Sequence, residues 1–120
     1  GCIAALILGN KNMNAVFTAI EILHELFLFN ELESKLPETV NVRIAIDSGY
    51  CAYKHSSEEL KKTELVKKIM EVESHYTPLN AITITNTIYA SLHPEIAKLF
   101  ILTRKSATPY YTYAVTWEDI

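Results

Sequence analysis

The stretch ELVKKIMEVESHYTPLNAITIT, residues 64–85, holds the patterns of a helix, a turn and a strand in immediate succession. Its apolar residues recur at steps of three and four, which is typical of a helix with one buried side. Pro78 cannot continue that helix, and the AITIT run that follows has the composition of a strand. On the polar side, Lys67 and Glu71 lie one helical turn apart. They form either part of a site or a solvated ion pair on the helix surface.

The residues before this stretch predict three more strands and a long helix. IAALIL, residues 3–8, is a continuous apolar run typical of a central strand. A helix with an apolar stripe follows it, capped by Asn12 or Asn14 and reaching about residue 29. In residues 40–46, VNVRIAI, apolar and other side chains alternate as in a half-buried strand. The next strand, YCAY at residues 50–53, is predicted to return as a hairpin.

The residues after this stretch are predicted to form a short helix over 86–92 and strands over 98–103 and 110–116. The full order is then β–α–β–β–α–β–α–β–β. This order predicts the α+β class, with an antiparallel-rich sheet and helices packed on one face. The 120 residues fit one domain, residues 1–120.

Composition and charge narrow the classes of function. The net charge is −3 and the basic residues are scattered, which argues against a nucleic-acid partner. Cys2 and Cys51 are the two cysteines, and such low usage favours reduced thiols and a cytoplasmic location. No His or Cys spacing typical of a metal site is present, so no cofactor is predicted from these residues. Apolar runs are too short to span a bilayer, so we expect no membrane contact from this segment.

Several segments taken in order resemble the class III adenylate/guanylate cyclase catalytic domain. They are GCIAALIL with NAVFTAIEIL, RIAIDSGYCAY (43–53), VKKIMEVESHYTPLNAITIT (66–85), NTIYASL and YYTYAV. No single segment is specific, but their order and spacing together match the C-terminal two-thirds of that domain. The resemblance implies a ferredoxin-like fold of the cyclase type, truncated at the N-terminus.

The resemblance also assigns family site positions to residues of this chain. In the family, two Asp residues hold the metal ions, and the second of them falls at Cys2, which cannot replace a hard oxygen ligand. The Asn that orients the ribose falls at Lys67. The Arg that stabilises the transition state falls at Glu71, which reverses the charge. The first metal Asp and the Lys that selects the purine would lie upstream of residue 1.

These substitutions imply a degenerate cyclase homology domain that is catalytically inactive. It would serve as a dimerisation or regulatory module of a larger signalling protein. One alternative is a functional cyclase that makes cyclic nucleotide and pyrophosphate from ATP or GTP, using Mg or Mn with atypical residues or a complementary heterodimer partner. A second alternative is an unrelated ferredoxin-like binding module.

The expected partner is a second copy of this chain or another cyclase-type domain. The family works as a head-to-tail dimer, so the resemblance implies pairing. Without the family's first strand and helix, the sheet would also have an uncovered edge and exposed apolar surface. Both considerations predict an oligomer.

Three weaker candidates complete the sequence-based predictions. Asp47 and Glu59 could form an acid/base pair, although turn and surface roles are favoured for both. His24 is expected to be a partly buried or surface side chain of a helix. A stacking patch is conceivable for three tyrosines, although alternation in a strand explains them more simply. These tyrosines are Tyr110, Tyr111 and Tyr113.

Overall fold

The computed structural model describes residues 11–33, 39–49, 59 and 62–116. Its elements in chain order are α1 (Asn12–Leu28), a π-helical turn η1 (Phe29–Glu33), β1 (Arg43–Ile46), α3 (Glu64–Tyr76), β2 (Ala81–Thr85), α4 (Asn86–Ser91), α5 (Pro94–Ala97), β3 (Ile101–Arg104) and β4 (Tyr110–Ala114). None of the helices within these ranges combines the length and apolar character needed to span a bilayer.

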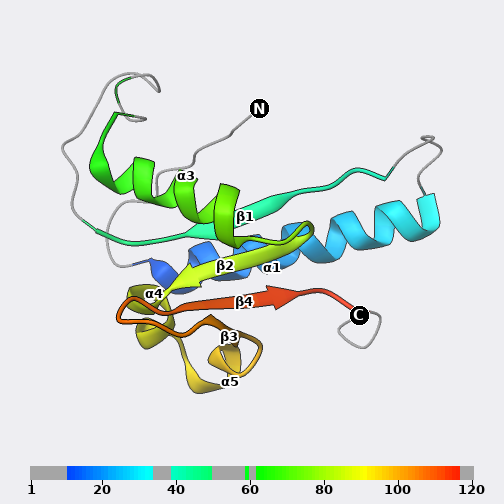
Figure 1. The fold of residues 1–120 in the computed structure, drawn as a ribbon. Helices are drawn as coiled ribbons and strands as arrows, with labels where there is room; N and C mark the ends of the chain where they lie inside the picture. The colour runs from blue at the N-terminus through cyan, green and yellow to red at the C-terminus, as the bar shows by residue number, and fades with distance from the viewer. Residues whose placement is uncertain (1–10, 34–38, 50–58, 60–61, 117–120) are drawn as a thin grey trace.

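The strands form a four-stranded mixed sheet in the order β1-β2-β4-β3. β1 pairs with β2 in parallel, while β2 with β4 and β4 with β3 pair antiparallel. The predicted α+β class is therefore confirmed, and the arrangement is consistent with a ferredoxin-like fold. Figure 1 shows β2 and β4 side by side at the centre of the molecule.

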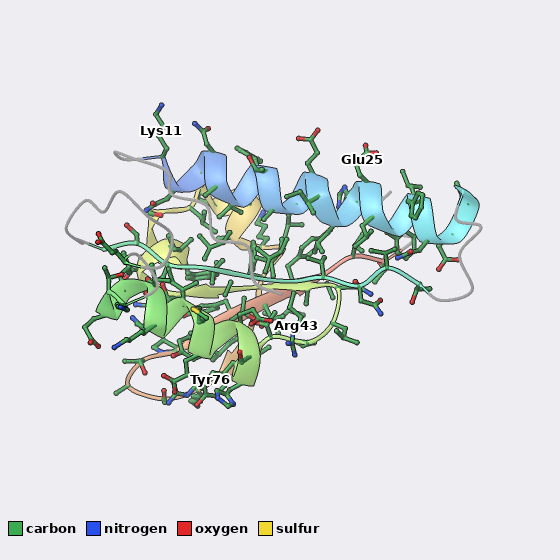
Figure 2. All side chains as sticks on the ribbon, turned by 90° about the horizontal axis from the view of Figure 1, so that it is seen from above. Lys11, Glu25, Arg43 and Tyr76 are labelled. Atoms are coloured by element: carbon green, nitrogen blue, oxygen red, sulfur yellow. The ribbon has the colours of Figure 1, made fainter. Side chains whose placement is uncertain are left out.

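The prediction that the helices pack on one face of the sheet is wrong for the described residues. Figure 2 shows α1 and α3 on opposite sides of the strands. The buried side chains agree with this arrangement, because Val16, Ala19 and Leu23 of α1 join a core that does not include Val72 of α3. The sheet is therefore covered on both faces.

The central strand β2 explains why both faces need a cover. All five of its residues are buried, and successive side chains of a strand point to opposite faces. Ile82 and Ile84 pack in the core with α1. Between them, the Thr83 hydroxyl donates to the carbonyl of Tyr76, the last residue of α3, at 3.4 Å. The alternation in AITIT thus separates an apolar face from a hydroxyl-bearing one.

Local signals in the sequence set the ends of α3. The Thr63 side chain caps its start by accepting the N–H of Val66, and the helix stops before Pro78. Asn80 then adopts a left-handed backbone, with φ of 59°. Its side-chain oxygen accepts the N–H of Val42 at 3.0 Å, and its own N–H donates to the Val42 carbonyl at 2.6 Å. This turn places β2 alongside β1.

Other predicted boundaries are partly confirmed. The first helix and the strands over 81–85 and 110–116 form close to the expected positions. The strand predicted over 98–103 begins only at Ile101, because α5 and the turn after it occupy the preceding residues. The strands predicted over 3–8 and 50–53 lie outside the described residues.

Candidate functional site

A buried carboxylate lies where the parallel strands β1 and β2 end. Asp47 directly follows β1, and its side chain is only 2% exposed. One oxygen, Oδ1, accepts the backbone N–H of Ser48 at 2.8 Å and the hydroxyl of Thr85 at 2.6 Å. The other, Oδ2, lies 3.1 Å from Nζ of Lys68 on α3. Asp47 therefore ties together the ends of two strands and a helix.

The turn that carries Asp47 approaches α3 closely. Gly49 follows Asp47 and Ser48, and a Cβ atom at Gly49 would lie 3.2 Å from Cδ1 of Leu65. This distance is tighter than most ordinary Cβ contacts. The absence of a side chain at Gly49 thus helps the turn to lie against α3, from which Lys68 reaches Asp47.

An open pocket of about 180 Å³ lies beside this ion pair. Its walls come from α3, from the junction between β2 and α4, and from the connection between β3 and β4. The lining residues are Lys68, Thr85, Asn86, Thr87, Ala107, Thr108, Pro109 and Tyr110. Lys68 and Thr85 thus belong both to the pocket wall and to the hydrogen-bonded group around Asp47.

A second cation, Arg104, lies at the end of β3, next to the β3–β4 connection. The guanidinium carbon of Arg104 lies 4.9 Å from the ring centre of Tyr76 and 4.8 Å from that of Tyr110. Both distances fall in the range of cation–π contacts. Nη1 of Arg104 also donates to the hydroxyl of Thr108, a pocket residue, at 3.3 Å. Arg104 is therefore held by two aromatic rings and by a residue of the pocket wall.

The two residues that the cyclase resemblance assigns to catalytic positions do not line this pocket. Lys67 and Glu71 are both exposed on α3. The ion pair that the structure shows for Lys67 is with Glu64, one turn earlier, at 3.9 Å. Of the two interpretations, the structure favours a surface position for both residues, but Lys67 pairs with Glu64 and not with Glu71. Cys2 lies outside the described residues.

The weaker candidates from the sequence are explained by their burial and by contacts within the fold. Asp47 is buried, so the surface role favoured from the sequence is wrong, whereas Glu59 is exposed as expected. Nε2 of His24 and the hydroxyl of Tyr113 form a partly buried hydrogen bond of 2.9 Å. Tyr111 stacks on Tyr89 with ring centres 3.7 Å apart, and both rings are partly buried against the core. The aromatic residues of β4 are thus explained by packing.

Metal ligands are a separate question. In the part of the chain that the structure describes, no group of three or more His, Cys, Asp or Glu side chains converges in a way that could hold a metal ion. Asp47, the most buried carboxylate in the ion pairs of this part, is occupied by Lys68, Thr85 and Ser48. Its arrangement resembles a structural anchor more than an open metal ligand.

Sequence reasoning missed Lys68 and Thr85. The available signal was positional, since Asp47 and Thr85 stand at the carboxyl ends of two strands and polar residues often meet there when such strands are parallel neighbours. The sequence predicted that the strand over 40–46 pairs with a hairpin strand over 50–53. It therefore did not predict the contact between Asp47 and Thr85.

Comparison of the chain with protein-family models, with curated proteins and with solved structures gave no match.

Proposed function

We propose that this chain is a degenerate nucleotide cyclase homology domain that is catalytically inactive and pairs with a second cyclase-type domain. The order of segments that resembles the family supports the proposal. The observation that carries it is the exposed side of α3, where Lys67 and Glu71 stand at positions that the family fills with an Asn and an Arg.

The chemistry of these two positions argues against cyclisation. Attack of a ribose hydroxyl on the α-phosphate develops negative charge, which needs positive donors. A carboxylate at Glu71 would repel a triphosphate. The Lys67 ammonium lies near Glu64, whose charge partly offsets it. Cys2, at the family's metal position, is a thiol and does not suit Mg²⁺ or Mn²⁺. The residues present therefore do not fit the family's metal-assisted reaction.

The same side of α3 suits pairing. Lys67 and Glu71 carry opposite charges one turn apart on an exposed helical face. In a two-fold symmetric dimer, the same patch meets itself in reverse, so Lys67 of one copy would face Glu71 of the other. The buried side of α3, which includes Val72, is already used within the fold. The exposed side remains for a partner.

An activity assay tests the first half of the proposal. We expect no cyclic nucleotide from ATP or GTP with Mn²⁺ when the full-length protein is folded. Formation of product that stops in a Lys67→Ala or Glu71→Ala variant would contradict the proposal. That result would support the alternative, an active cyclase with atypical residues.

A charge-swap series in sedimentation equilibrium tests the pairing. We expect wild type to form a dimer, and Lys67→Glu or Glu71→Lys alone to weaken it by about tenfold, since each places like charges in opposition. The double swap, Lys67→Glu with Glu71→Lys, should restore the affinity because the charges again match.

Lys98→Glu is the control for this series, since Lys98 is exposed on the distant α5 segment beside Glu95. It should leave dimerisation unchanged. A monomeric wild type would refute the pairing, and single swaps without effect would refute the assigned surface.

A further inference from the structure

We infer that the pocket beside Asp47 binds a small phosphate-type oxyanion, with Lys68 as the group that anchors it. Lys68 is the only charged residue among those that line the pocket in the described part of the chain. Its side chain is 50% exposed, yet its ammonium is fixed by Asp47 at 3.1 Å. An ammonium has three N–H donors, so the contact with Asp47 leaves donors for a ligand. Because Lys68 is already held, binding costs less side-chain entropy than it would at a free lysine.

The charges around the pocket favour an anion. Lys68 lines the pocket and Arg104 is bonded to the lining residue Thr108, so the two contribute two positive charges, and Asp47 contributes one negative charge. The Asp47 carboxylate already accepts three donors, and it is buried behind Lys68. Glu64 and Glu71 lie one turn from Lys68 on α3, but both point to solvent, and Glu64 is paired with Lys67. The local balance is therefore positive.

The neutral groups of the wall also offer hydrogen-bond donors. The Thr108 hydroxyl accepts from Arg104, so its own proton is free to donate elsewhere. The side-chain oxygen of Asn86 accepts from the hydroxyl of Tyr111 at 3.4 Å, which leaves the amide NH₂ as the remaining group. Thr85 is the exception, because its proton goes to Asp47. Thr108 and Asn86 thus each accept one hydrogen bond within the fold and keep a donor for an oxyanion.

The size of the pocket limits the ligand. At about 180 Å³, the pocket is smaller than the roughly 300–1,000 Å³ of sites for drug-sized ligands. A phosphate group fits this space, whereas a complete nucleotide does not. The inference is independent of the proposed pairing, since neither Lys67 nor Glu71 lines the pocket.

Titration with inorganic phosphate tests the inference, with sodium chloride of equal ionic strength as the reference. We expect saturable changes in amide NMR shifts, concentrated in residues 85–87 and 107–110, together with a rise in Tm beyond that in chloride. Lys68→Gln should raise the Kd for phosphate at least about tenfold, because a charge-assisted hydrogen bond is lost. Lys98→Gln removes the same charge from another ion-paired lysine, with Glu95 at 3.0 Å, and should bind as wild type does.

A second variant guards against misfolding of Lys68→Gln, which leaves Asp47 buried without its cation. Ala107→Leu fills the pocket from the β3–β4 connection and does not alter the ion pair. It should also abolish phosphate binding. The inference is overturned if phosphate affects wild type no more than chloride does, if the shifts lie elsewhere, or if Ala107→Leu binds phosphate unchanged.

Discussion

The buried carboxylate of Asp47 links the end of β1 to Thr85 of β2 and to Lys68 of α3. Asp47→Asn keeps the shape and one side-chain oxygen, but removes the charge that faces Lys68. We expect the free energy of unfolding to fall by about 1–3 kcal/mol, because hydrogen bonds to a buried charged group are replaced by weaker ones. Urea denaturation followed by circular dichroism measures the change.

The exposed pair of Lys98 and Glu95 provides the control for this variant. Glu95→Gln should change the free energy of unfolding by no more than about 0.5 kcal/mol, since exposed ion pairs contribute little. Equal effects of the two substitutions would show that the burial of Asp47 does not contribute to stability.

At the scale of elements, Asn80 sets how β1 and β2 come together. Asn80→Gly and Asn80→Ala both remove the side-chain bond to the Val42 N–H, but only alanine must also adopt a left-handed backbone with φ of 59°. We expect alanine to cost about 1 kcal/mol more than glycine in the free energy of unfolding. Thermal or urea denaturation of both variants compares them, and equal stabilities would contradict the left-handed assignment.

The elements predictable from the sequence were those with a strong local signal. α3 has an apolar stripe and a following proline, and β2 is a short β-branched run between turn residues, whereas the cap at Thr63 was not predicted. The start of β3 was not predictable, because Leu99 and Phe100 are apolar enough for a strand and the turn after α5 excludes them. The partners of each strand were harder still, since pairing joins residues far apart in the chain.

The candidate site depends on this long-range pairing. Asp47 and Thr85 are separated by 38 positions, and they meet only because β1 and β2 are parallel neighbours. Lys68 adds a third element to the group. By contrast, the exposure of Lys67 and Glu71 followed from helical periodicity within α3 alone. The sequence therefore predicted the surface of α3 better than it predicted the pocket.

At the scale of the whole molecule, the two covered faces of the sheet predict two independent apolar layers. Leu23 lies on the α1 side and Val72 on the α3 side, and only Leu23 belongs to the main core cluster. We expect Leu23→Ala to cost about 2–5 kcal/mol and Val72→Ala about 1.5–3 kcal/mol. The double variant should match the sum within about 0.5 kcal/mol, since only Leu23 of the two belongs to the main core cluster.

Urea denaturation of the two single variants and the double variant measures this additivity. Ile101→Ala, at a side chain that is 70% exposed, should change stability by no more than about 0.5 kcal/mol. A coupling energy well above that margin between Leu23 and Val72 would indicate one shared core instead of two layers.

The strand order also affects how the nascent chain can fold during translation. β2 lies between β1 and β4, so its second neighbour is synthesised only after residues 86–109 have left the ribosome. Until then, a nascent chain with β1 and β2 in place has one side of β2 unpaired, with Ile82 and Ile84 beside the open backbone groups. Such an edge can pair with other chains. Translation through this interval is therefore the stage at which a ribosome-associated chaperone would protect the protein most.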